Sequence, residues 1–214
     1  MRFRDRTQAG RLLGERLARL ADQSPVVVGL PRGGVPVAAE IAKRLGAPLD
    51  VILVRKVGAP DRAELAAGAV GEDDVTVRNL AVLQGMGLSW EDDLGAQVAR
   101  ERAEVRRRAG ALRRGRERVD LLDRTVIIVD DGIATGSTVV AAMRVVRGLG
   151  ARRVVLAVPV APADTLQRMG ELADEVVCLH APTRFLAVGQ WFEDFRQVTD
   201  AEVRVLLGSL DPDG

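Results

Sequence analysis

One stretch of this chain limits its fold more than any other. Four apolar residues, Val126 to Val129, run directly into two carboxylates, Asp130 and Asp131. An apolar run of this length is typical of a strand that is buried on both faces, as in a parallel sheet. A turn rich in Gly and hydroxyl residues follows at 134–138, and a helical pattern begins there. The sequence therefore predicts a strand, an acidic strand end, a tight turn and a helix in direct succession.

This succession predicts a ligand that carries both a phosphate and hydroxyl groups. The first backbone N–H groups of a helix have no partner inside the helix, so they form a ready phosphate site. Ligands of open α/β sheets bind at the carboxyl ends of the strands, where the two acids lie. A ribose 5-phosphate has the required groups. The simpler alternative is that Ser137 or another hydroxyl of the turn merely caps the helix. Neither a P-loop motif nor a Rossmann glycine motif is present.

The segment Asp130–Thr138, with the letters DDGIATGST, resembles the phosphoribosyl diphosphate (PRPP) signature of the type I phosphoribosyltransferase family. The resemblance implies that Asp130 and Asp131 bind the ribose hydroxyls and act in catalysis. It implies that the 5-phosphate is held by the turn, which consists of Ala134, Thr135, Gly136, Ser137 and Thr138. It also implies Mg2+ as cofactor, with Asp130 and Asp131 as indirect ligands through PRPP and water. Family members acting on hypoxanthine or guanine usually have an acid where this chain has Ala134, so that proton acceptor is missing here.

Strands and helices alternate over much of the chain. Strands are predicted at 26–30, 51–54, 126–129, 154–160 and 175–180, and helices at 7–20, 35–45, 137–149 and from about 162. This alternation predicts an α/β fold with a mostly parallel sheet flanked by helices. A capping box at 199–202 predicts the start of a last helix. The length of 214 residues suits a single domain over 1–214.

The middle of the chain, about 60–118, departs from this alternation and is predicted to be an insertion. Two short strands at 65–70 and 75–77 predict a hairpin, and 90–117 predicts a long helix or helix pair that Ser89 caps. Nine arginines lie between Arg100 and Arg118. They could pair with glutamates on a solvated helix. Alternatively, the helix covers the site or contacts a second subunit, and one arginine reaches a phosphate; the candidates are Arg106, Arg107, Arg113 and Arg114.

Two further segments match parts of a phosphoribosyl site. The glycine-rich stretch 29–35 resembles the family's diphosphate loop, so Arg32, Gly33 and Gly34 are predicted to bind diphosphate, with a non-proline cis peptide at Arg32–Gly33. A guanidinium fork and close backbone N–H groups suit an anion. Lys56, predicted at the end of the second strand, resembles a basic residue that family members direct at the same group, which implies that it binds the diphosphate and acts in catalysis. A plain glycine turn and a surface lysine are the alternatives.

The C-terminal region, from about 181 to 214 with the N-terminal segment, resembles the family's hood over the nucleobase. It is rich in aromatic residues, and Phe185, Trp191 and Phe192 are the candidates to stack on a base. The same aromatics could instead pack the hood onto the sheet. The single histidine, His180, is predicted to end a strand near the site.

Composition excludes several other classes of protein. Net charge is +1, which gives no general attraction to nucleic acid, and a lone Cys178 excludes a disulfide scaffold. No apolar run suggests a signal or a membrane span, so a cytoplasmic protein is expected. The resemblance implies a glycosyltransferase of nucleotide metabolism that transfers phosphoribosyl from PRPP to a small nitrogenous acceptor and could form a homodimer. A PRPP-sensing regulatory protein without transferase activity is the alternative.

Overall fold

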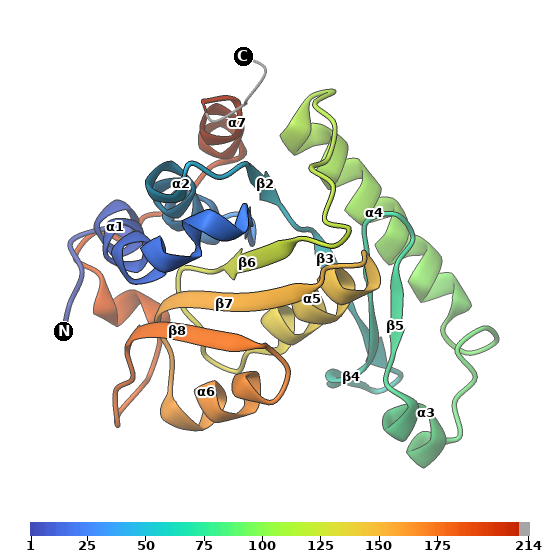
Figure 1. Cartoon of the computed structure of the whole chain (residues 1–214). Helices are drawn as coiled ribbons and strands as arrows, with labels where there is room; N and C mark the ends of the chain where they lie inside the picture. Colours follow the sequence, from blue (N-terminus) through green and yellow to red (C-terminus); the bar gives the residue numbers. More distant parts are fainter. Residues whose placement is uncertain (210–214) are drawn as a thin grey trace.

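The computed structural model describes residues 1–209, apart from the side chains of Ala63 and Glu64. It contains a five-stranded parallel sheet in the order β2-β1-β6-β7-β8 and a three-stranded antiparallel sheet in the order β3-β4-β5 (Figure 1). The parallel strands are β1 (Val26–Gly29), β2 (Leu49–Val51), β6 (Thr125–Val129), β7 (Arg153–Val160) and β8 (Glu175–His180). The predicted α/β fold with a parallel sheet is therefore confirmed.

Helices cover both faces of the parallel sheet. They are α1 (Arg6–Leu17), α2 (Gly34–Leu45), α5 (Ser137–Gly148) and α6 (Ala163–Gly170). Helix α7 (Asp200–Gly208) packs on α2, and 3-10 turns lie at Ala18–Gln23 and Val188–Trp191. Alternate side chains of β6 point to opposite faces. Ile127 packs with residues of α1 and α2, and Ile128 packs with residues of α5 and α6. This double cover explains why β6 is apolar on both of its faces. The capping box predicted at Thr199 is confirmed.

The antiparallel sheet lies in the middle of the chain and consists of β3 (Val54–Ala59), β4 (Arg62–Gly71) and β5 (Thr76–Arg78). The predicted hairpin is confirmed, because β4 and β5 pair with Val70 opposite Thr76. The single strand predicted at 51–54 is wrong. The parallel strand β2 ends at Val51, and Val54 begins β3 of the other sheet. Continuous apolar sequence from 51 to 54 hides this change of sheet.

The arginine-rich region folds into α4 (Gly95–Arg113), preceded by the short helix α3 (Leu80–Met86). Helix α4 buries one stripe, Val98, Val105 and Leu112, and packs on β3, β4 and α7 (Figure 1). The expectation of an ordered helix with one buried stripe is therefore confirmed. Its predicted start is wrong, because Ser89 caps a separate turn through Asp92, and α4 begins at Gly95 without a side-chain cap.

No helix among residues 1–209 is long and apolar enough to span a membrane.

Candidate active site

The loops that follow β1 and β6 meet at the carboxyl edge of the parallel sheet. The two strands are neighbours, and Gly29 pairs with Val129 at their ends. The backbone of Gly33 lies so close to Asp131 that a Cβ on residue 33 would overlap the carboxylate, and a Cβ on Gly34 would lie 2.5 Å from the carbonyl oxygen of Val129. Glycine is therefore required at 33 and 34 for the loop after β1 to contact the residues that follow β6. The sequence prediction placed these two segments at one site without predicting this contact.

The two adjacent acids of this edge differ in their partners. Asp130 accepts a hydrogen bond from the backbone N–H of Asp131 (2.9 Å), and the Asp131 carboxylate forms an ion pair with Arg6 (2.8 Å). Burial holds the pKa of Asp130 well above its usual range, and the negative charge of Asp131 raises it further. Burial also raises the pKa of Asp131, against the opposing effect of Arg6. Acids with raised pKa values in a cleft are typical of functional sites.

The turn at 134–138 leads directly into α5. Gly136 adopts the left-handed conformation (φ 78°) as the residue before the helix, and Ser137 is its first residue. Thr165 of α6 donates a hydrogen bond to the carbonyl oxygen of Ala134 (2.9 Å), which holds the turn from outside. The N–H groups at the start of α5 are left for a ligand or solvent. Thr135 and Thr138 are exposed.

Lys56 reaches this turn from the other sheet. Its Nζ lies 3.2 Å from the Oγ of Ser137. The expected location at the end of a parallel strand is wrong, because Lys56 is in the interior of β3. The side chain nevertheless arrives at the predicted phosphate turn, since β3 packs on α5. Its ammonium therefore adds a positive charge beside the turn.

The loop after β1 carries a non-proline cis peptide at Pro31–Arg32. The prediction of Arg32–Gly33 is wrong by one bond. Arg32 is half-buried, and its guanidinium lies 3.7 Å from Asp200 at the start of α7. A cavity of about 360 Å3 opens between this loop and the acids, and its lining residues are Arg6, Arg32, Gly33, Asp131, Phe195, Gln197 and Val198.

The hood forms from the two ends of the chain. Phe3 pairs with Phe192 in an isolated bridge, and the two rings lie 5.4 Å apart. Phe192 is 2% exposed, so it packs the hood and has no free face for a base. Trp191 contacts the ring of His180, which ends β8 as predicted. Phe185 is half-exposed.

The sequence analysis missed four residues that line this cavity, Arg6, Phe195, Gln197 and Val198. The Arg6 guanidinium lies 4.0 Å from the centre of the Phe195 ring. Phe195 lies within the aromatic segment and follows Phe192 by three positions, which was a usable signal. Arg6 had no local signal, because its place depends on the start of α1 reaching the carboxyl edge of the sheet.

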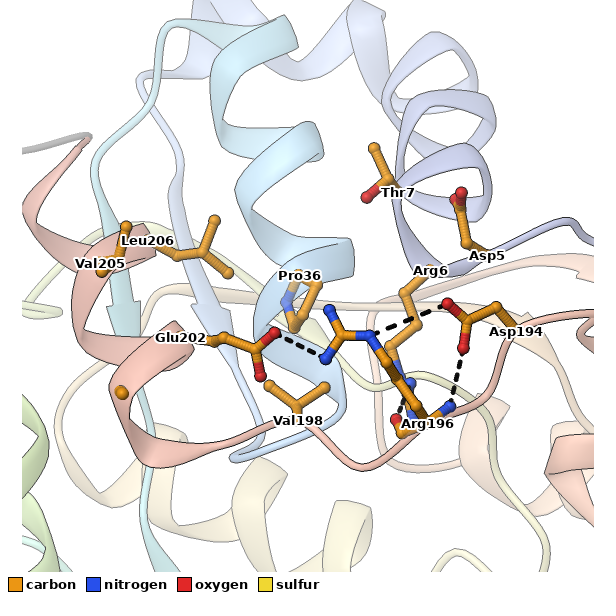
Figure 2. Close-up of a pocket in the computed structure, with 11 residues that line it drawn as sticks. Asp5, Arg6, Thr7, Pro36, Asp194, Arg196, Val198, Glu202, Val205 and Leu206 are labelled. Atoms are coloured by element: carbon orange, nitrogen blue, oxygen red, sulfur yellow. Dashed lines mark hydrogen bonds and ion pairs between the residues drawn. The ribbon is translucent and has the colours of Figure 1, made fainter.

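A second cavity of about 430 Å3 lies beyond Arg6, between the starts of α1, α2 and α7 (Figure 2). It shares Arg6 and Val198 with the first cavity. Its apolar wall includes Pro36 and Leu206, and an exposed ion pair of Arg196 with Glu202 (2.7 Å) crosses it. Arg6 is thus the charged side chain that lines both cavities.

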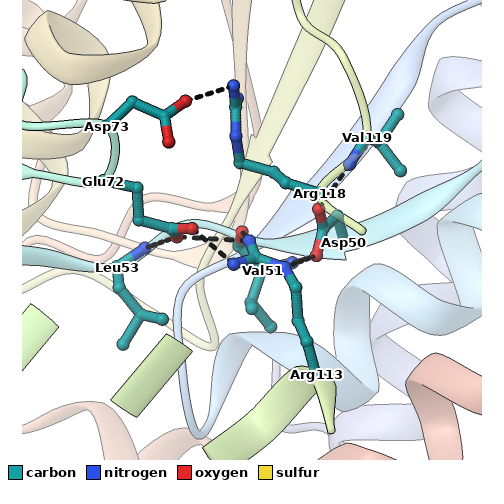
Figure 3. A network of polar contacts seen from close by, with 8 residues as sticks. All are labelled: Asp50, Val51, Leu53, Glu72, Asp73, Arg113, Arg118 and Val119. Carbon is teal, nitrogen blue, oxygen red and sulfur yellow. Dashed lines mark hydrogen bonds and ion pairs between the residues drawn. The ribbon is translucent and has the colours of Figure 1, made fainter. Parts of the chain in front are cut away.

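The arginines of α4 are mostly engaged in ion pairs. Arg113 is buried between Asp50 and Glu72, so its predicted contact with a phosphate is wrong (Figure 3). Arg106 lies 3.8 Å from Asp74, and Arg107 pairs with Glu104 one helical turn away (2.8 Å). Arg114 ends the helix in the left-handed conformation. These pairs favour the simpler interpretation of a solvated, charge-paired helix; a contact with a second subunit stays a prediction.

With this geometry in place, comparison with known proteins assigns the class. The phosphoribosyl transferase domain family matches residues 6–188, and the chain belongs to this family. Two Mycobacterium tuberculosis proteins, Rv0571c (strain H37Rv) and MT0597 (strain CDC 1551), are each 53% identical over 208 residues, and both carry the provisional name phosphoribosyl transferase. The alignment covers 96% of this chain but 46% of each relative, so the chain spans about half the length of the curated relatives it matches.

A solved structure shares the whole fold. The crystal structure of TT1426 from Thermus thermophilus superposes with a TM-score of 0.91 at 48% identity and covers 98% of this chain and 99% of TT1426. The insertion and the hood thus belong to a fold that occurs in a second protein of nearly the same length.

Proposed function

We propose that the protein binds PRPP with Mg2+ and transfers the phosphoribosyl group to a small nitrogenous base, releasing diphosphate. One observation carries the proposal. At a single edge of the sheet, the Gly33 backbone contacts the Asp131 carboxylate, while the Lys56 ammonium contacts Ser137 at the start of α5. PRPP bound here would meet the residues proposed for diphosphate, ribose and 5-phosphate in the order in which it carries these groups.

Each part of the site has a distinct role in this proposal. The start of α5, from Ala134 to Thr138, holds the 5-phosphate through backbone N–H groups. The carboxylates of Asp130 and Asp131 accept hydrogen bonds from the ribose hydroxyls, which relieves the cost of two buried like charges. Arg32 and the backbone at Gly33 and Gly34 hold the diphosphate as it leaves.

The residues fit a magnesium ion that is carried by the substrate. Among the described residues, no group of three or more His, Cys, Asp or Glu side chains could hold a metal alone. Mg2+ usually binds through one or two carboxylates together with substrate phosphates and water. Asp130 and Asp131 would supply the protein side of such a site, and the ion would neutralise charge on the leaving diphosphate.

In the proposed reaction, the bond from the ribose C1 to the diphosphate oxygen breaks, and a bond from C1 to a nitrogen of the base forms. Positive charge develops at the ribose, close to the two acids, and this favours the transition state electrostatically. The base loses a proton. Ala134 has no group that can accept it, so the proton leaves to water or to an acid of the site.

Calorimetric titration with PRPP and Mg2+, followed by a diphosphate-release assay over a panel of nucleobases, tests the proposal. We expect binding and release with at least one base, and also stabilisation by the ligand. Absence of binding at millimolar Mg-PRPP would overturn the proposal. Binding without diphosphate release for any base would instead favour the PRPP-sensing alternative. A cytoplasmic location stays a prediction.

A further inference from the structure

The position of Arg6 in the candidate site is set by backbone hydrogen bonds between the N-terminal segment and the hood. The Phe3 N–H donates to the carbonyl oxygen of Trp191 (2.7 Å), and the Glu193 N–H donates to that of Phe3 (2.8 Å). Asp5 then caps α1 by accepting from the Gln8 N–H (2.7 Å). Arg6 follows as the first helical residue. Its side chain is therefore placed by the same contacts that place the hood.

The Arg6 guanidinium makes three kinds of contact in the cavity. Nε and Nη2 each lie 2.8 Å from the Asp131 carboxylate, and Nη1 donates to the carbonyl oxygen of Arg196 (2.8 Å). The planar group lies 4.0 Å from the centre of the Phe195 ring. The side chain is 11% exposed. A flat group with N–H donors is thus stacked on an aromatic ring and bonded to a hood carbonyl and to an active-site acid.

These contacts compete with the contacts that the proposed reaction requires. Two guanidinium N–H groups occupy Oδ2 of Asp131, so this oxygen is not available to the ribose hydroxyls while Arg6 is bound. A positive charge at this place would also oppose the positive charge that develops on the ribose. The Arg6–Asp131 ion pair therefore competes with substrate for this carboxylate.

We infer that Arg6 occupies the acceptor subsite and is displaced when substrate binds. The inference rests on the proposed function and adds to it that Arg6 competes with substrate at this subsite. The group that replaces Arg6 has to lie flat on Phe195 and donate an N–H to the Arg196 carbonyl oxygen. A planar heterocycle with an amino or ring N–H edge meets both conditions, as the guanidinium does now.

The second cavity provides a place for the displaced side chain (Figure 2). Arg6 already lines it, together with the carboxylates of Asp5, Asp194 and Glu202. Glu202 is charged at neutral pH, because hydrogen bonds from Thr199 and Arg196 lower its pKa to about 2. Arg196, its present partner, is 66% exposed and can turn to solvent. The guanidinium can thus exchange one carboxylate partner for another.

Calorimetric titration of Mg-PRPP into wild type, Arg6→Met, Arg6→Gln and the control Arg11→Met tests the inference. Arg11 lies on the same helix in an exposed ion pair with Glu40, so its loss controls for charge. If the state with Arg6 on Asp131 makes up about nine-tenths of the population, its removal should tighten binding about tenfold. Arg11→Met should bind like wild type. Two substitutions at position 6 guard against one that fails to fold.

A second arm restores the missing group. Methylguanidinium at low millimolar concentration should weaken Mg-PRPP binding to Arg6→Met and leave wild type unchanged. Equal or weaker Mg-PRPP binding by both Arg6 variants than by wild type would overturn the inference while leaving the proposed function standing. Absence of binding by wild type and by all variants would overturn the proposed function, and the inference with it.

Discussion

Two pairs of acids with little exposure, each with one arginine partner, stand out among residues 1–209, and their charges are compensated differently. Asp50 and Glu72 share Arg113 where β2, β4 and α4 end (Figure 3). Asp130 and Asp131 follow β6, and Arg6 pairs with one of them. Both sets combine two acids with one arginine, so the difference lies in how many hydrogen bonds each carboxylate receives.

We call Asp50 and Glu72 the closed pair, because donors within the protein occupy both carboxylates. Asp50 is 1% exposed and accepts from the backbone N–H groups of Val51 (2.8 Å) and Val119 (2.9 Å) as well as from Arg113. Glu72 accepts from the Leu53 N–H (3.1 Å) and from the same guanidinium. Each carboxylate therefore has a backbone donor in addition to its ion pair. Such a fully bonded group fastens α4 to both sheets and has little capacity left for a ligand.

We call Asp130 and Asp131 the open pair, because the protein compensates their charge only in part. Burial and mutual repulsion raise the pKa of Asp130, and the recorded hydrogen bond to its side chain comes from its own neighbour, Asp131. Arg6 offsets part of the charge of Asp131. Buried charge that the protein compensates incompletely is available to ligand hydroxyls or a cation. The comparison teaches that the two pairs differ in how fully protein donors compensate the carboxylate charge. This difference, rather than burial or composition, separates the structural acids from the candidate functional acids.

The largest effect on stability should follow from removing the arginine of the closed pair. Arg113→Met leaves two buried carboxylates without their cation, and breaking such a pair typically costs about 3–5 kcal/mol of folding free energy. Urea unfolding measures this loss. Arg107→Met, which removes an exposed pair on the same helix, should leave stability nearly unchanged. A loss below about 1 kcal/mol for Arg113→Met would contradict the structural role assigned here.

The open pair should respond in the opposite way. The double substitution Asp130→Asn and Asp131→Asn should leave the free energy of unfolding equal or higher, because like-charge repulsion disappears. It should weaken Mg-PRPP binding about 100-fold, since hydrogen bonds to charged groups contribute about 1.5–3 kcal/mol each. Calorimetry and urea unfolding of the same samples measure both.

Asp50→Asn is the matched control for that experiment. It should lower stability and leave the Mg-PRPP affinity of the folded protein unchanged. If the double Asn variant bound Mg-PRPP as tightly as wild type, the role of Asp130 and Asp131 would be wrong.

A smaller effect on binding should follow from changing the backbone that touches the open pair. A Cβ at residue 33 would overlap the Asp131 carboxylate, so Gly33→Ala must shift the loop or the acid. We expect Mg-PRPP binding to weaken about tenfold, which corresponds to about 1.4 kcal/mol. Gly110→Ala in α4 meets nothing within 4 Å and is the control. Unchanged affinity of Gly33→Ala in titration would argue against this loop as part of the site.

The sequence predicted the elements whose causes are local. The apolar run 126–129, the glycine turn and the capping box at Thr199 depend on neighbouring residues, and the structure has them at the expected positions. Errors arose where distant contacts decide. The chain changes sheets between Val51 and Val54 because β3 pairs with β4, and no periodicity at 51–54 reveals that pairing.

The same distinction holds for the candidate site. Gly33 and Asp131 could be assigned from motifs, but the guanidinium contacts of Arg6 and Arg113 could not. These two arginines look alike in sequence, and their partners lie 125 and 63 residues away (Asp131 and Asp50). Which arginine serves the site and which serves the framework is therefore decided by tertiary structure alone.

The smallest expected effect is a difference in pH dependence between wild type and the double Asn variant. The folded-state pKa values of Asp130 and Asp131 are raised, so between the ordinary value of 3.8 and the raised value the native state holds more protons than the unfolded chain. Stability then falls as pH rises through this window and stays lower above it. The variant lacks this contribution, so its free energy of unfolding should exceed that of wild type by a margin that grows from about pH 4 upward and then levels off.

Glu202 and other acids with lowered pKa values titrate in both proteins and cancel in the difference. Urea unfolding of both proteins across this range measures it, and parallel curves would mean that the second pair is as fully compensated as the first.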